Sequence, residues 1–183
     1  MALLRRATNP NPTLQSYTAS AQLSATLHVM VPYSKTFSGT VYYLKPKRKI
    51  EFRNVTGPLS RFKDLAASTP TYDAAVDEYT ITPIADDGTV STYSAVPKKS
   101  GSRVRAVTLS VNDSSALVSH AKWSYTNGGT LDLDQTYTKV GEFRLTSVLD
   151  IRARFPGYSV DGTVTFSDYR PNASVDPSMF ATP

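Results

Sequence analysis

The sequence predicts an all-β protein, and its composition, its alternation and its turns each support that class. Thr, Val and Tyr suit a pleated, half-buried surface and are abundant, whereas Glu, common on exposed helix faces, occupies only three of 183 positions. Apolar and polar residues alternate in ten segments, mostly separated by Gly, Pro, Asn or Asp, as in half-buried strands. These segments are residues 15–30, 36–45, 48–55, 79–84, 89–96, 103–112, 117–126, 130–140, 143–155 and 158–168.

The longest alternation, in residues 15–30, has an apolar face that is poor in large side chains. Alternate residues of a strand point to opposite faces, so this face is expected to lie inside. Two interpretations remain open, a ligand cavity and a core that large residues of other strands, such as Phe37 and Phe155, complete. The face consists of Tyr17, Ala19, Ala21, Leu23, Ala25, Leu27 and Val29.

Only one helix is expected. Leu59, Phe62 and Leu65 recur at helical spacing, and Pro58 stands near the first helical position, where a missing N–H does no harm. The pattern predicts a short helix from Pro58 to Ala67 that covers the sheet, followed by a polar loop.

The first twelve residues contain two Asn-Pro steps and are predicted to be disordered or extended. The length of the chain corresponds to one domain, which we expect to span residues 13–183. The first twelve residues lack the apolar core of a secretory signal, so we expect either a cytoplasmic protein or a mature sequence without its signal.

Composition excludes several kinds of site. No apolar run approaches the ~18 residues of a transmembrane helix. The absence of cysteine removes disulfides, thiolate catalysis and cysteine-based metal sites. Because the two histidines, His28 and His120, leave little scope for a histidine-rich site, we expect no metal and no cofactor.

The net charge is +5, and seven of the 20 basic residues fall between Lys45 and Lys63. Lys45, Lys47, Arg48 and Lys49 place four positive charges within five residues. Contact with an anionic membrane surface is one interpretation, and a solvated turn between two strands is the other. We do not expect nucleic acid as a partner, because acidic residues dilute the patch.

Candidate catalytic groups are few. Asp132 and Asp134 could form a carboxylate pair, and His28 or His120 could act as a general base. All four fall on the polar faces of their strands, where solvated side chains are the simpler interpretation. No nucleophile motif, phosphate loop or metal-ligand spacing accompanies them. The sequence therefore predicts a protein that is not an enzyme.

Three segments resemble those of a known family. They are residues 12–19 (PTLQSYTA), residues 37–46 (FSGTVYYLKP) with residues 49–52 (KIEF), and residues 166–176 (FSDYRPNASVD), after which the resemblance ends at Phe180. In these segments, and in the order of its parts, the chain resembles the LolA/LppX superfamily of bacterial lipoprotein carriers and lipoproteins.

The resemblance implies a strongly curved antiparallel sheet of about ten to eleven strands, which forms an incomplete barrel covered by one or two short helices. It implies an apolar cavity between sheet and helices, and Arg48 and Arg53 are candidates for the family's arginine that tethers the lid. The expected cavity lining is Tyr17, Ala19, Ala21, Leu23, Ala25, Leu27, Phe37, Val41, Tyr43, Phe52, Leu59, Phe62, Leu65, Trp123 and Phe143.

The expected function is non-enzymatic binding or carriage of a lipid or lipoprotein acyl chain in that cavity. The resemblance implies a bacterial protein of the periplasm or another extracytoplasmic site, with its signal peptide removed, and we expect a monomer. Two alternatives stay open: a small enzyme that uses the same half-barrel on an apolar substrate, and a structural or interaction module with a filled core.

Overall fold

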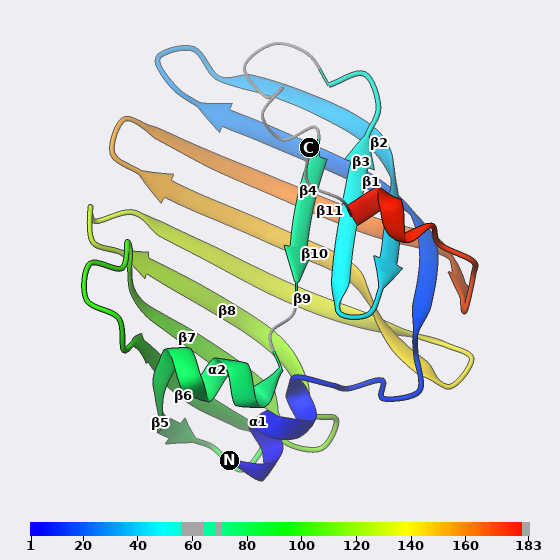
Figure 1. Cartoon of the computed structure of the whole chain (residues 1–183). Helices are drawn as coiled ribbons and strands as arrows, with labels where there is room; N and C mark the ends of the chain where they lie inside the picture. Colours follow the sequence, from blue (N-terminus) through cyan, green and yellow to red (C-terminus); the bar gives the residue numbers. More distant parts are fainter. Residues whose placement is uncertain (56–63, 69–70, 181–183) are drawn as a thin grey trace.

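The computed structural model describes residues 1–55, 64–68 and 71–180, and for residues 64–68 it describes the backbone. The described residues form one antiparallel sheet of eleven strands, which curves without closing (Figure 1). The strands are β1 (Ser16–His28), β2 (Tyr33–Leu44), β3 (Lys47–Phe52), β4 (Asp64–Ser68), β5 (Tyr79–Asp86), β6 (Val90–Pro97), β7 (Val104–Asn112), β8 (Leu117–Tyr125), β9 (Thr130–Val140), β10 (Phe143–Phe155) and β11 (Tyr158–Pro171). The predicted fold class is confirmed, and each of the ten predicted segments contains a strand.

The strand order is β4-β3-β2-β1-β11-β10-β9-β8-β7-β6-β5. Two meanders, β1 to β4 and β5 to β11, are joined where β1 pairs with β11. Strands β4 and β5 are consecutive in the chain but form opposite edges of the sheet. On the β5 edge, Pro83 cannot donate a backbone hydrogen bond, and the pairing with β6 shifts between Pro83 and Ala85.

The N-terminal residues differ from the prediction of a disordered or extended segment. Residues Ala2–Ala7 form helix α1. Leu4 and Ala7 are buried with Tyr93 and Val111 of the sheet, and this contact supplies the tertiary packing that so short a helix needs.

The helix predicted from Pro58 to Ala67 is wrong for its second half. There β4 pairs with β3, with Leu65 opposite Ile50, while residues 58–63 lie outside the described part. Leu65, Ala66 and Ala67 are consecutive apolar residues, which fit a period of 2 as well as one of 3.6. Because these residues pair with the otherwise free edge of β3, they adopt a strand rather than a helix.

The loop predicted after that segment is also wrong in part. It contains helix α2 (Tyr72–Glu78), and Thr71 caps this helix by accepting a hydrogen bond from the Ala74 N–H at 3.2 Å. Near the C-terminus, a 3₁₀ turn, η2 (Pro177–Phe180), lies beside β3.

Two clusters of buried side chains lie on the concave face of the sheet. The larger cluster covers β1, β2, β3 and the neighbouring parts of β10 and β11. The smaller cluster lies where α1 packs on β6 and β7, with Tyr72 of α2 at its border. Helices α1 and α2 are therefore on the same side of the sheet (Figure 1). Val29, predicted to face inward, instead lies beyond the end of β1 and is 48% exposed.

The opposite, convex face carries a ladder of ion pairs across β8, β9, β10, β11 and β1. His120 contacts Asp134 at 2.7 Å, and Arg152 contacts the same carboxylate. Further along the face, the Asp161 carboxylate contacts the Arg154 guanidinium at 2.5 Å and the His28 ring nitrogen Nε2 at 2.9 Å. This face is polar throughout the ladder, so the sheet has one dry face and one wet face.

These contacts hold two carboxyl groups in the ionised form. The hydrogen bond from His120, followed by that from Arg152, lowers the pKa of Asp134. Arg154, and to a smaller extent His28, lowers the pKa of Asp161. Because the pKa of each carboxyl group is lower in the folded chain than in a free aspartate, its ionisation stabilises the fold, and this contribution is lost as the pH falls through the lowered pKa.

We expect the thermal unfolding midpoint to fall as the pH decreases below about 4, where protonation removes this contribution. Asp134→Asn combined with Asp161→Asn should make that fall smaller, and only modestly so, because both side chains are about 40% exposed. Calorimetry between about pH 2 and 7 measures the effect. Asp77→Asn, at an exposed position on α2, is the control, and an equal flattening by this variant would contradict the prediction.

Two glycines beside β1 fit the close packing of the concave face to different extents. Gly39 lies opposite Ala21, and a Cβ atom there would stand 2.5 Å from the Glu51 carbonyl oxygen and 2.8 Å from the Phe52 ring. A Cβ atom on Gly162 would meet its nearest neighbours at 3.5 Å, an ordinary contact.

Gly39→Ala should therefore destabilise the fold by about 1–3 kcal/mol through overpacking against the backbone. Gly162→Ala should change the free energy of unfolding by less than about 0.5 kcal/mol. Urea unfolding of the two variants tests this difference, and similar losses at both positions would refute it.

Candidate functional site

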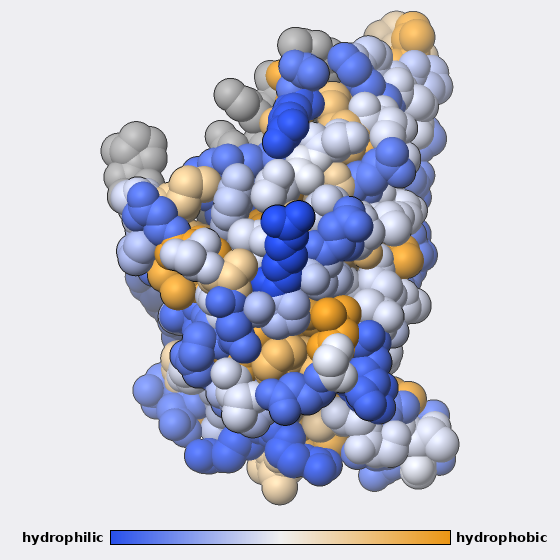
Figure 2. All heavy atoms as spheres, turned by 90° about the vertical axis from the view of Figure 1, so that its right-hand side faces the viewer, coloured by the Kyte–Doolittle hydropathy of each residue, from blue (hydrophilic) through white to orange (hydrophobic). Residues whose placement is uncertain are grey.

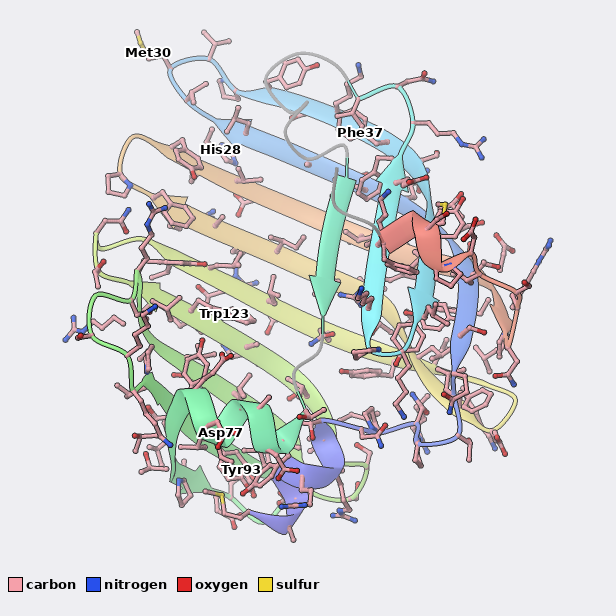
Figure 3. The ribbon with its side chains drawn as sticks, viewed as in Figure 1. His28, Met30, Phe37, Asp77, Tyr93 and Trp123 are labelled. Atoms are coloured by element: carbon pink, nitrogen blue, oxygen red, sulfur yellow. The ribbon has the colours of Figure 1, made fainter. Side chains whose placement is uncertain are left out.

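The middle of the concave face is apolar and is covered by neither cluster of buried side chains. Trp123 of β8 lies opposite Leu131 of β9. Leu133 follows two residues later on β9 and therefore lies on the same face. All three are partly buried, and they belong to neither cluster. Figure 3 places Trp123 on the part of the sheet between α2 and the β1–β2 hairpin.

This apolar surface continues onto β10. Leu133 faces Ile151, and Leu131 faces Ala153, and both β10 residues are partly buried and pack against the larger cluster. We call Trp123, Leu131, Leu133, Ile151 and Ala153 the apolar strip. It runs across three neighbouring strands, with the larger cluster on its β11 side and the smaller cluster on its β7 side.

Aromatic residues close one end of the strip, where β8, β10 and β11 meet their turns. The ring centroid of Phe155 is 5.2 Å from that of Tyr125 and 5.4 Å from that of Tyr158. Gly129 lies under the Phe155 ring, and a Cβ atom there would stand only 2.3 Å from it. The turn thus supports a fixed aromatic border.

Arg48 faces the concave side near the other end of β9. Arg48 alternates with the buried Ile50 and Phe52 along β3, so its side chain starts on the inner face. It lies opposite Tyr43 in the sheet and hydrogen-bonds Tyr17.

Tyrosines from four other strands, β1, β2, β9 and β11, surround this arginine. The Tyr17 ring stacks on Tyr43 at 4.9 Å between centroids and meets Tyr169 edge-on at 5.4 Å. Arg48 also acts electrostatically on Tyr137 of β9, which is five strands away from β3 in the sheet. The curvature of the sheet brings the two strands to face each other.

Burial keeps these phenols neutral. Desolvation raises the pKa of Tyr137 to about 12 and raises the pKa of Tyr169 as well, although Arg48 opposes both shifts. The Tyr137 hydroxyl donates to the Val118 carbonyl at 2.7 Å, and the Tyr169 hydroxyl donates to the carbonyl of Thr146. These bonds anchor the tyrosines, which form a polar but uncharged wall around Arg48.

The structure places most residues of the expected cavity lining in the packed larger cluster. Tyr43 and Trp123 are partly buried. Leu59 and Phe62 lie outside the described residues, and Leu65 lies in β4, whose backbone alone is described. The lining role itself stays a prediction. The buried members are Tyr17, Ala19, Ala21, Leu23, Ala25, Leu27, Phe37, Val41, Phe52 and Phe143.

Sequence reasoning missed four residues of the strip, Leu131, Leu133, Ile151 and Ala153. The alternation of their strands put them on the inner face, but alternation cannot show which inner residues stay outside the buried clusters, as Leu131 and Leu133 do, and which pack against one, as Ile151 and Ala153 do. That depends on where α1, α2 and the strands β3 and β4 lie relative to the rest of the inner face.

The basic side chains of residues 45–49 do not form one patch, because they face different parts of the molecule. Arg48 faces the concave side, Lys45 donates to the Pro12 carbonyl at 3.1 Å, and Lys49 pairs with Glu51 at 2.7 Å. Figure 2 views this end of the molecule, where hydrophilic residues predominate and apolar residues are scattered among them. Of the two arginines considered as lid tethers, Arg53 is exposed. Binding of a membrane surface and tethering of a lid stay predictions.

The groups considered for catalysis lie away from the strip. Asp132, Asp134, His28 and His120 all belong to the ladder of the convex face. Among the described residues, no three acidic or histidine side chains gather closely enough to hold a metal ion. Within the same residues, no helix has the length and apolar character needed to cross a membrane.

Two hollows of the surface also lie elsewhere. A shallow one of about 530 Å³ opens on the convex face, between Ser24, Thr36 and Asp161. Another, of about 630 Å³, opens between Glu78 and Lys98 at the end of α2. Neither includes a residue of the apolar strip.

Comparison of sequences found no match, either to a family model or to a curated protein. Comparison of structures found several similar folds. A structure described as an outer membrane lipoprotein-sorting protein domain from Vibrio parahaemolyticus is 12% identical, with a TM-score of 0.66, over 98% of this chain and 94% of that one. A DUF1329 family protein from Desulfovibrio piger is also 12% identical, with a TM-score of 0.58, over 98% and 95% of the two chains.

A LolA superfamily protein from Nitrosomonas europaea is 8% identical, with a TM-score of 0.52, over 99% of this chain and 96% of that one. These similarities cover nearly the whole of each chain, so they concern the complete curved sheet and its covering helices. At such low identity they establish the architecture. The chain has the fold of the LolA superfamily.

Proposed function

We propose that this protein binds the acyl chain of a lipid or lipoprotein on the apolar strip, without catalysis. The observation that supports this most directly is the partial exposure of Trp123, Leu131 and Leu133 between two packed clusters. A continuous apolar surface that remains open in a soluble protein commonly marks a binding site.

The energetics of transfer favour such a ligand. Each buried methylene contributes ~0.8 kcal/mol, so a long chain gains affinity from its length without specific polar contacts. From Leu131 to Tyr137, β9 extends over about 20 Å at ~3.3 Å per residue, which is comparable with a long acyl chain.

The fold supports the same class of ligand, because one structural relative is described as a lipoprotein-sorting domain. An extracytoplasmic location, in the periplasm of a bacterium, belongs to the proposal on the same ground. The convex position of the histidines and of the paired aspartates argues against a catalytic role for them. A filled module without ligand is the alternative that the following experiment decides.

The single tryptophan of the chain reports on the site directly. Bromine-substituted palmitic acid should quench Trp123 fluorescence in a saturable manner, because the bound chain would lie against the indole ring. Unbrominated palmitic acid should reverse the quenching by competition, and bromoacetate, which has no long chain, is the control. Absence of saturable quenching, together with absence of lipid in an organic extract of the purified protein, would exclude the proposal.

A charge on the strip should prevent binding. We expect Leu133→Glu to lower the affinity for the brominated acid at least tenfold, since a bound chain would desolvate the carboxylate. Ile84→Glu places the same charge on an apolar residue that is 56% exposed on β5, and it should bind like the wild type. Circular dichroism confirms that both variants are folded, and equal affinities for all three proteins would contradict the prediction.

A further inference from the structure

Arg48 lacks an acidic partner among the residues that the structure describes. Several other cations of the sheet have such partners: Lys49 pairs with Glu51, and Arg152 and Arg154 pair with aspartates of the ladder. No ion pair of the described residues includes Arg48, although its side chain is partly buried.

The surroundings of this guanidinium compensate its charge incompletely. Arg48 hydrogen-bonds the neutral Tyr17 hydroxyl, and the hydroxyls of Tyr137 and Tyr169 donate their hydrogen bonds to backbone carbonyls. A guanidinium presents five N–H donors in a planar fork. Several of these donors remain for a planar or tetrahedral anion, which Arg binds with two parallel hydrogen bonds.

The position of Arg48 relates it to the apolar strip. Tyr137, on which Arg48 acts, lies on β9 six residues after Leu131, on the same face by alternation. Between them, Gln135 faces Leu149 of β10, so the inner surface becomes more polar toward the arginine. The strip thus begins at an aromatic border and leads toward Arg48.

We propose that Arg48 binds the anionic head of the ligand, so that the protein selects acidic amphiphiles whose chain lies on the apolar strip. This inference rests on the proposed function and adds the chemical class of the ligand. The head group is a carboxylate or a phosphate, because both accept a bidentate pair of hydrogen bonds from one guanidinium. The neighbouring tyrosines hold the guanidinium in place and exclude part of the water that would screen the contact.

The test compares ligands that share one chain and differ in the head. Dodecanoic acid, dodecyl phosphate and dodecanol displace Nile red, a neutral fluorescent probe, from the wild type and from variants at about pH 8, where the acid is ionised. At least one of the two anions should bind the wild type tenfold or more tightly than the alcohol. The anion with the larger preference identifies carboxylate or phosphate as the natural head.

Arg48→Met should reduce that preference to about one while leaving the affinity for dodecanol unchanged. Arg48→Lys keeps the charge without the planar fork, and it should retain part of the preference. Arg53→Met is the matched control, since it removes an exposed arginine five residues later, and it should behave like the wild type.

Three results would overturn the inference. Equal affinities of the wild type for alcohol and anions would show that the head is not recognised. A loss by Arg48→Met that is the same for alcohol and anions would assign Arg48 to the structure of the site. The same loss of preference in Arg53→Met would indicate a general effect of charge. In each of these cases dodecanol still binds, so the proposed function stands, whereas failure of every ligand to displace the probe would reject both.

Discussion

The length of chain between β4 and β5 constrains the whole architecture, because these consecutive strands form opposite edges of the sheet. In a flat sheet of eleven strands, at ~4.8 Å per spacing, the two edges would lie about 48 Å apart. The four steps from Ser68 to Tyr72 reach at most about 14 Å, and the seven residues of α2 add about 10 Å. The sheet must therefore curl, and that curl brings β3 to face β9 across the concave side.

Small residues near the junction of the two meanders allow this curvature. Ala21 lies beside Gly39, and Ala25 lies beside Gly162, so each strand that neighbours β1 has a glycine next to an alanine on the inner face. Phe52 occupies the space above Gly39. The small side chains of β1 thus have two kinds of neighbour. Beside Ala21 the Phe52 side chain fills the space, whereas beside Ala25 a Cβ atom on Gly162 would make only ordinary contacts.

Alternation was sufficient to predict ten of the eleven strands, because a sheet with one buried and one exposed face gives an unambiguous period of two. It failed at residues 64–67, where consecutive apolar residues fit either period, and at α1, whose stability depends on Tyr93 and Val111 far along the chain. For the site, the sequence indicated an apolar inner face and singled out Trp123 and Arg48. It could not separate covered from uncovered residues, so Leu131 and Leu133 were not recognised as a surface.

The unpaired edge at β5 has a consequence for the behaviour of the chain in solution. An open sheet presents backbone donors and acceptors that can template the addition of a strand from another molecule. Pro83 removes one of these donors, and the register shift that follows it twists the edge away from the flat geometry that such growth requires. An incomplete barrel can thus keep its inner face open without inviting fibrillar association along this border.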